Sequence, residues 1–353
     1  MIKENIRKLV NGADLTHEES AASMKEIMSG EATNTQIGAF LTALRMKGET
    51  SDEITAFTSV MKQYCNRIHP TVKGRLVDTC GTGGDKIKTF NISTTVAFVV
   101  AGADVAVAKH GNRSVTSKCG SADVLEMLGL NLSIAPEDVE RTIEEVGMGF
   151  MFAPAFHPAM KFAIGPRREV GIRTVFNVLG PLTNPADATA QLLGVYDSRL
   201  TEPLAHSLKN LGCEEAMVVH GLDGLDEIST IGKTAISWLI NSEVTTMEMA
   251  PKDFGVKQAK LEDIKGTTPE KSAELTFKIL YGNISANDPR REIVQVNGAA
   301  AIIVAGKAEG FSYGMETAKE SIESGRAYKK LKELVKFSGG DISNLEQLES
   351  GHA

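Results

Sequence analysis

The first 65 residues carry polar and apolar positions with the spacing of helices joined by short connections. Within them, one set of apolar residues recurs at i, i+3, i+4 and i+7, which is the spacing of a single helix face. These residues are Ile37, Phe40, Leu41 and Leu44. Three capping boxes, in which side chain and backbone satisfy each other, are Thr16-x-x-Glu19, Thr33-x-x-Gln36 and Thr50-x-x-Glu53. The pattern predicts a small helical domain.

Beyond His69-Pro70 the pattern changes to strand, helix, strand. Residues 76–80 read as a strand, 93–103 as a buried helix and 105–108 as a second strand, a rhythm typical of an α/β sheet. Further helices are expected at 121–128, 137–146, 203–211, 290–305 and 315–337, and further strands at 191–196, 216–220 and 244–249. A helical stretch at about 158–170 is expected to return to the helical domain. The polar tail from Ser338 is expected to be frayed.

Length and composition narrow the class of protein. At roughly 150 residues per domain, 353 residues suggest two domains. The formal charge of −7 argues against a general nucleic-acid binder but leaves a local basic pocket open. No apolar run reaches the length of about 18 residues that a membrane span needs, and the first residues lack a signal peptide's apolar core. The four cysteines form no CxxC pair, which favours reduced thiols and a cytoplasmic protein.

A glycine cluster follows the first predicted strand. Three glycines among four residues, Gly81-Thr-Gly83-Gly84, let backbone N–H groups approach an anion closely, and a helix begins soon afterwards. The alternative is an ordinary tight turn. A second loop, Lys109–Ser117, follows the next strand and combines two fixed cations, a histidine, an amide and three hydroxyls. Such a loop suits a polyphosphate, the alternative being a solvated polar loop.

Two charged pairs complete the candidate chemistry. Asp226-Glu227 offers adjacent hard oxygen ligands, which suit Mg²⁺ when substrate phosphates complete its shell. A charged surface turn is the alternative. Arg167-Arg168 could hold a carboxylate or a phosphate through a guanidinium fork, and an exposed helix end is the alternative there.

Taken together, seven segments resemble the anthranilate phosphoribosyltransferase family in order and spacing, across essentially the whole chain. They are GTGGD (81–85), NIST (91–94), KHGNRSVTS (109–117), GSAD (120–123), HPAM (157–160), TVFNVLGPLTNP (174–185) and GLDE (224–227). The resemblance implies transfer of the 5-phosphoribosyl group from phosphoribosyl pyrophosphate to the amine of anthranilate, in tryptophan biosynthesis.

The same resemblance implies the fold and assembly. We expect an α/β protein of the nucleoside-phosphorylase/phosphoribosyltransferase type, with a small helical N-terminal domain and a large α/β domain built on a central mixed sheet. The small domain is expected to comprise residues 1–70 plus about 158–185, and the large domain 71–157 and 186–353. A homodimer is expected, with anthranilate synthase components as possible partners and neither nucleic acid nor membrane.

Site residues are carried over from the family's motifs. The phosphoribosyl pyrophosphate site is expected to comprise Gly81, Gly84, Asp85, Thr89, Asn91, Ile92, Ser93, Thr94, Lys109, His110, Gly111, Asn112, Arg113, Ser114, Val115, Thr116, Ser117 and Ser121. The anthranilate contacts are Gly81, Asn112, Arg167 and His110, with Arg168 as the alternative to Arg167. The metal ligands are Ser93, Asp226 and Glu227, for two Mg²⁺ ions per subunit. No general base is assigned.

Two other functions compete with this one. A pyrimidine nucleoside phosphorylase shares the fold but normally carries a Lys-His-Ser-Thr-Gly-Gly type of phosphate loop, whereas this chain reads Lys109-His-Gly-Asn112. A non-catalytic nucleic-acid-binding relative is disfavoured by the acidic balance and by the intact Asp226-Glu227 pair.

Overall fold

The computed structural model describes residues 1–84, 87–114, 119–266 and 268–352. Its helices are α1 (Ile2–Val10), α2 (His17–Met28), α3 (Asn34–Lys47), α4 (Ser51–Gln63), α5 (Ile92–Gly102), α6 (Ser121–Met127), α7 (Pro136–Val146), α8 (Ala153–Phe156), α9 (Lys161–Val170), α10 (Phe176–Leu182), α11 (Thr201–Asn210), α12 (Pro269–Leu280), α13 (Pro289–Val304), α14 (Phe311–Glu323), α15 (Arg326–Phe337) and α16 (Ser343–His352). Its strands are β1 (Leu76–Gly81), β2 (Ala106–Gly111), β3 (Met148–Phe152), β4 (Ala190–Gly194), β5 (Glu215–Gly221), β6 (Thr234–Ile240) and β7 (Glu243–Met249).

The seven strands form one mixed sheet in the order β3-β2-β1-β4-β5-β6-β7. The first five in this order are parallel, and β6 and β7 join antiparallel at one edge. Because the chain leaves β1 toward β2 on one side and later enters β4 on the other, the strand order reverses between β1 and β4. In open α/β sheets such a switch point is where ligands bind, beyond the carboxyl ends of the strands.

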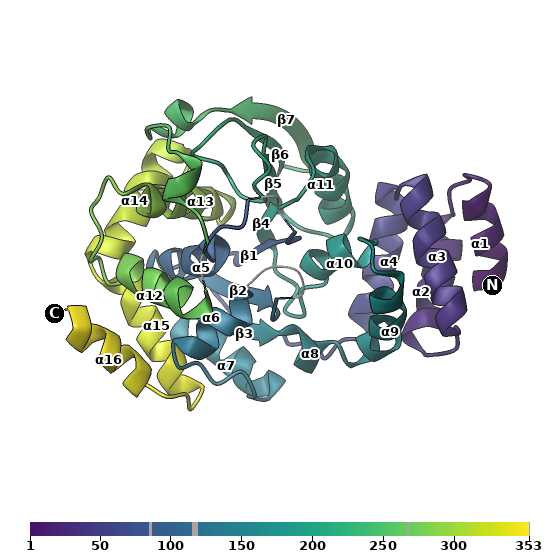
Figure 1. Cartoon of the computed structure of the whole chain (residues 1–353), viewed down its shortest axis with the longest axis horizontal. Helices are drawn as coiled ribbons and strands as arrows, with labels where there is room; N and C mark the ends of the chain where they lie inside the picture. The colour runs from purple at the N-terminus through teal and green to yellow at the C-terminus, as the bar shows by residue number, and fades with distance from the viewer. Residues whose placement is uncertain (85–86, 115–118, 267, 353) are drawn as a thin grey trace.

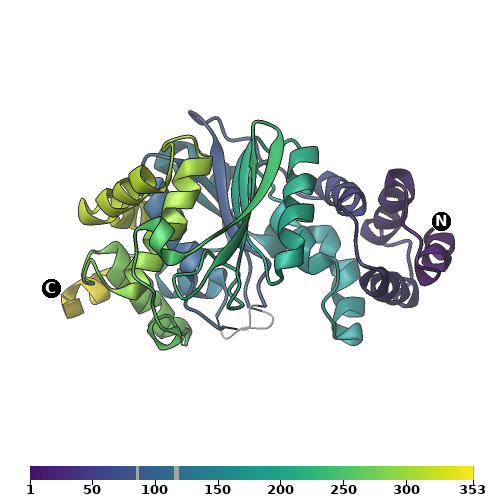
Figure 2. The ribbon, with the colours of Figure 1, turned by 90° about the horizontal axis from the view of Figure 1, so that it is seen from above.

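Both faces of the sheet are covered, as Figure 2 shows with the strands seen between two groups of helices. On β5, Met217 and Val219 join the core with α5 and α13, whereas Ala216 and Val218 join the core on the opposite face. This two-residue alternation is the period of a strand, and covering on both faces leaves the parallel strands almost continuously buried, including polar residues such as Asp78 and Lys109.

The helical bundle α1–α4 lies at one end of the molecule, beside α9 and α10 (Figure 1). All three predicted capping boxes are present at the starts of α2, α3 and α4. Helix α9 packs on α3 and also contacts α2, although about a hundred residues separate it from the bundle in sequence. A Cβ atom at Gly30, which follows α2, would lie 2.7 Å from the Phe162 ring of α9, so this glycine permits the close approach.

Several sequence expectations were wrong. The helix expected over 315–337 is two helices, α14 and α15, because Gly325 adopts a left-handed φ of +73° between them. The tail expected to be frayed forms α16, whose Leu345 is fully buried. Strands β3 and β6 and helix α12 were not predicted at all. Among the described residues, no helix is long and apolar enough to cross a membrane.

Candidate active site at the carboxyl edge of the sheet

Hydrogen bonds to Gly194, Tyr196 and Asp226 fix the glycine turn after β1. Thr82 donates its backbone N–H to the Gly194 carbonyl over 2.9 Å, and its hydroxyl accepts the Tyr196 N–H over 3.1 Å. The Gly83 N–H points to the Asp226 carboxylate at 3.0 Å. Gly83 and Gly84 adopt φ values of +65° and +81°, which side-chain-bearing residues rarely tolerate. The turn is thus a fixed structure, and the predicted residue Asp85 lies just outside the described residues.

The predicted metal acids follow β5 and reach this turn. Asp226 is half-buried, and burial raises the pKa of its carboxyl. Hydrogen bonds from backbone N–H groups and the charges of His220 and Arg173 lower this pKa, but by less. A Cβ atom at Gly194 would overlap the Asp226 carbonyl, so the end of β4 must be glycine for the acid loop to pack there. Glu227 is buried beside it. A carboxylate whose charge is poorly compensated fits a cation site.

The third predicted ligand, Ser93, stands in the first turn of α5, and its carbonyl accepts the Thr79 hydroxyl over 3.0 Å. Within the described residues, no three His, Cys, Asp or Glu side chains form a complete metal site. Two carboxylates are fewer than the six or so oxygen ligands that Mg²⁺ takes, so an ion bound by Asp226 and Glu227 would need oxygen ligands from other groups.

The basic loop begins inside the sheet. Lys109 on β2 is 1% exposed and donates to the Thr79 carbonyl over 2.6 Å. Burial lowers its pKa, and the charges of Asp78, Cys80 and Glu227 counteract that effect. At the loop's far side, the charge of Arg113 is compensated by ion pairs with Asp123 and Glu126 of α6, and its guanidinium lies over the Phe152 ring at the end of β3.

The remaining predicted donors of this region occupy varied surroundings. The side chain of Asn91 bonds Ser272 at 2.8 Å and Cys119 O at 3.4 Å, so it ties α5 to its neighbours. Asn112 is exposed, and its carbonyl accepts the Ser121 hydroxyl over 3.3 Å. Thr94 is buried with a hydroxyl that has no partner among the described residues.

Other members of the predicted set are placed as follows. Ile92 is buried in the core, Thr89 forms an isolated bridge with Lys265, and Gly111 ends β2 with Ser114 shortly after it. Val115, Thr116 and Ser117 lie outside the described residues.

Two histidines meet at the same edge. His110, at the end of β2, lies with its ring centroid 5.0 Å from that of His157, between α8 and α9. Both Nε2 atoms are buried without a hydrogen-bond partner among the described residues. Burial lowers the pKa of His110 to about 3, helped by His157, and that of His157 to about 4. Both rings are therefore neutral near pH 7; sequence analysis included His157 only in the HPAM segment (157–160) and assigned it no role in the site.

A buried acid supports this arrangement and was also missed. Asp78 on β1 accepts the His110 N–H over 3.2 Å and the Asn184 amide over 2.7 Å. The same Asn184 amide donates to Ala108 O over 2.8 Å. Burial raises the pKa of Asp78 to about 6, and Lys109 opposes the rise. Asp78 thus links β1 to the end of β2, where the basic loop begins. Through Asn184 it also links both strands to the loop before β4.

Of the two adjacent arginines on α9, only one has the setting of an anion contact. Arg167 is partly buried, its guanidinium lies 5.1 Å from the Phe176 ring centroid, and burial lowers its pKa. Among the described residues it has no acidic partner within salt-bridge distance. Arg168 is exposed. A desolvated guanidinium without a counterion is a natural contact for a substrate carboxylate.

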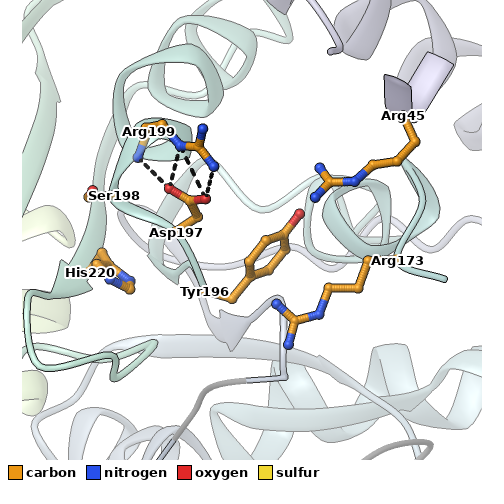
Figure 3. A pocket seen from close by; sticks show the side chains of 7 residues that line it. All are labelled: Arg45, Arg173, Tyr196, Asp197, Ser198, Arg199 and His220. Carbon is orange, nitrogen blue, oxygen red and sulfur yellow. Dashed lines mark hydrogen bonds and ion pairs between the residues drawn. The ribbon is translucent and has the colours of Figure 1, made fainter. Parts of the chain in front are cut away.

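A polar cavity of about 360 Å³ lies on the bundle side of the glycine turn (Figure 3). Its lining residues are Arg45, Arg173, Tyr196, Asp197, Ser198, Arg199 and His220. Arg199 is neutralised by Asp197, whereas Arg173 donates to the Gly84 carbonyl and lies over Tyr196. None of these residues was among the sequence candidates.

Two family profiles match the chain: "Glycosyl transferase family, helical bundle domain" over residues 3–65, and "Glycosyl transferase family, a/b domain" over 73–328. An anthranilate phosphoribosyltransferase of Acetivibrio thermocellus is 50% identical over 98% of this chain and 99% of its own. One of Methanocorpusculum labreanum is 52% identical over 96% of this chain and 99% of its own.

Solved structures agree with these relatives. The anthranilate phosphoribosyltransferase of Thermus thermophilus matches with a TM-score of 0.89 at 38% identity, covering 95% of this chain and 99% of that chain. The Saccharomyces cerevisiae enzyme in complex with PRPP (phosphoribosyl pyrophosphate) and Mg matches with a TM-score of 0.88 at 27% identity, covering 96% and 98%. The same yeast enzyme in complex with 4-fluoroanthranilate matches with a TM-score of 0.86 at 26% identity, covering 96% and 98%.

Proposed function

Since this chain belongs to the anthranilate phosphoribosyltransferase family, we propose that it carries out the family's reaction at the carboxyl edge of its sheet. The chain transfers the 5-phosphoribosyl group from PRPP to the amine of anthranilate, releasing pyrophosphate, as a step of tryptophan biosynthesis. The observation that carries the assignment is the meeting of the glycine turn with Asp226 at the switch point of the sheet, beside the strand that bears Lys109. Anion-binding amides, a buried cation and metal-ligating acids are the groups that a diphosphate donor needs.

The donor end of the site is proposed to hold PRPP on the turn Gly81–Gly84, the start of α5 and the loop after β2. Ser93, Asp226 and Glu227 are proposed to hold Mg²⁺, two ions per subunit, with donor phosphate oxygens completing the coordination. When bound, Mg²⁺ offsets the negative charge that grows on pyrophosphate as it departs. Arg113 is supported least, because its charge is already neutralised by α6.

The acceptor end is proposed to hold anthranilate between Arg167, Asn112 and the edge of the glycine turn, with His110 alongside. The lone desolvated guanidinium of Arg167 supports it as the carboxylate contact in preference to Arg168. His157 joins the set because its ring packs on His110. The aryl amine of anthranilate is unprotonated at pH 7 by its own low basicity, and two uncharged imidazoles with unpartnered Nε2 atoms place no positive charge beside it.

The chemistry then follows from charge. As the ribose C1–O bond breaks, the ring gains positive character and the pyrophosphate oxygen gains negative charge. Backbone N–H groups of the turn and the Lys109 ammonium supply fixed positive potential there, and they need no reorganisation because the fold already holds them. The nitrogen of anthranilate attacks C1 with its own lone pair, and after the C–N bond forms the cationic nitrogen gives its proton to water or to the released pyrophosphate. No general base has to act before attack, because an aryl amine is neutral at pH 7.

Assembly and organisation are part of the proposal. The small domain would comprise residues 1–70 plus about 158–185, which is supported by the packing of α9 on the bundle. A homodimer through the small domain is supported by the exposed apolar side chains of Val10 and Met46 on the bundle and of Ile164 on α9. Anthranilate synthase components are proposed as its partners. Four free thiols are consistent with a cytoplasmic location.

One assay tests the function directly. The fluorescence of anthranilate should fall when the protein is mixed with PRPP and Mg²⁺, and should not fall when either is left out. Phosphate-dependent cleavage of pyrimidine nucleosides should be absent. Phosphorolysis without anthranilate consumption would contradict the proposal and point to the phosphorylases of the same fold.

A further inference from the structure

Arg173 lies in the short segment between α9 and α10, outside every motif that the proposed reaction uses. One of its Nη atoms donates to the Gly84 carbonyl, so a guanidinium from the α9–α10 segment touches the backbone of the glycine turn. Its Cζ lies 4.4 Å from the centroid of the Tyr196 ring, which follows β4. Figure 3 shows Arg173 and Arg45 approaching Tyr196 from two sides.

Gly84 is shaped to this contact. A Cβ atom there would lie 2.8 Å from Nη2 and 3.1 Å from Cζ of Arg173, and the residue has a φ of +81°. Any side chain at position 84 would thus strain the backbone and displace the guanidinium. The rest of the turn is tied to β4 and to the acid loop through Thr82 and Gly83. Arg173 adds a tie from the segment that also carries Arg167.

We propose that Arg173 is a positioning residue: from its place over the Tyr196 ring it holds the Gly84 carbonyl, and so keeps the N–H groups of the turn directed at the donor pyrophosphate. Because Arg173 follows α9, the shape of the donor site depends on how α9 and α10 are seated. PRPP binding and the placement of the anthranilate carboxylate contact are thereby mechanically linked. This inference rests on the proposed function and assigns Arg173 no contact with either substrate.

A second arginine in the same cavity allows the effect of the Arg173 contact to be distinguished from the effect of its charge. Arg45 of α3 lines the same cavity, is exposed like Arg173, and has no hydrogen bond or ion pair with any residue that the structure describes. Asp197 is paired with Arg199, and Glu49 and Asp226 are the other acids near Tyr196 or Arg173. Removing Arg45 or Arg173 changes the cavity by the same single charge, but only Arg173 touches the turn.

The test compares Arg173→Met with the matched control Arg45→Met. We expect Arg173→Met to raise the KM for PRPP by about 10-fold or more, as loss of a charge-assisted hydrogen bond should, with a smaller change in kcat. Arg45→Met should stay within about twofold of the parent chain. Direct calorimetric titration of Mg²⁺ and PRPP, without anthranilate, should show the same weakening.

A second variant guards against misfolding. Tyr196→Leu removes the ring under the guanidinium, keeps the backbone bond to Thr82, and should raise the KM for PRPP in the same direction but less. Melting temperatures report whether each variant is folded. Equal effects of Arg45→Met and Arg173→Met, or a loss of kcat with unchanged PRPP affinity, would overturn the proposal. Failure of the parent chain to consume anthranilate would overturn the proposed function instead, while calorimetry still tests Arg173.

Discussion

Replacing Arg167 with methionine removes a guanidinium that the fold has partly desolvated without giving it a counterion. Methionine is shorter than arginine but keeps the apolar stem, which can still pack toward Phe176, whose ring centroid lies 5.1 Å from the present guanidinium carbon. If Arg167 holds the anthranilate carboxylate, the variant leaves a substrate charge unpaired in a partly buried site. Loss of one partner from such a pair costs about 2–4 kcal/mol. At about 1.4 kcal/mol per tenfold, kcat/KM for anthranilate should fall roughly 30- to 1,000-fold.

The same substitution should spare stability, and this distinguishes it from a packing defect. Burial lowers the pKa of Arg167 without any acid to offset it, so the folded chain bears an unfavourable charge. Only a cation–π contact of about 0.5–1 kcal/mol is lost in exchange. We therefore expect a melting temperature close to that of the parent chain, measured by differential scanning calorimetry.

Steady-state assays with each substrate varied in turn decide the case. The matched control is Arg168→Met on the exposed side of the same helix turn, which should change kcat/KM for anthranilate less than about twofold. The KM for PRPP should be nearly unchanged in both variants. The reasoning is refuted if Arg168→Met has the larger effect, or if Arg167→Met weakens the use of both substrates equally.

Three further predictions concern the acids and histidines. Asp226→Asn with Glu227→Gln should abolish Mg²⁺-dependent turnover without lowering the melting temperature, because burial already raises the pKa of Asp226; retained turnover would remove the pair from the site. His157 has a pKa of about 4 in the folded chain against about 6.5 unfolded, so the unfolded chain binds the extra proton first. Stability should fall as pH drops from 6.5 toward 4, by up to about 3 kcal/mol, and urea titrations of His157→Asn should show a shallower fall, whereas an identical slope would contradict the buried neutral ring. Asp78→Ala should lower the free energy of unfolding by about 3–5 kcal/mol, since it strips Lys109 of an opposite charge and two donors of their acceptor; a urea-measured loss below about 1 kcal/mol would speak against the network.

Local signals explain what the sequence predicted well. Capping boxes and helix periodicity depend on neighbours three or four residues away, so α2–α4 could be predicted directly. Glycines after an apolar strand similarly predicted a backbone turn, and Gly83 and Gly84 do adopt left-handed conformations. Strand β6, which lies between β5 and β7, was missed because it follows β5 without an intervening helix and so has no place in a βαβ rhythm.

Contacts between distant segments explain what was missed. Asp78 and Asn184 are 106 positions apart, and nothing in either local pattern announces the hydrogen bond. His157 gained its place beside His110 only when β3 paired with β2 and carried the following segment to the same edge. Arg113 shows the opposite case, in which a cation in a donor-rich loop is taken by acids on the next helix. The local sequence pattern predicts which kinds of side chain a loop carries, whereas contacts between distant segments decide which of those side chains remain available to a ligand.

The wedge of Phe162 over Gly30 has a consequence for how the protein is made. Helices α1–α4 leave the ribosome first, yet the helix that completes their packing is synthesised about a hundred residues later. At about 5–20 residues per second, the nascent bundle waits roughly 5–20 s with one side uncovered. During translation, that open side is where a chaperone or a neighbouring nascent chain would find exposed apolar surface.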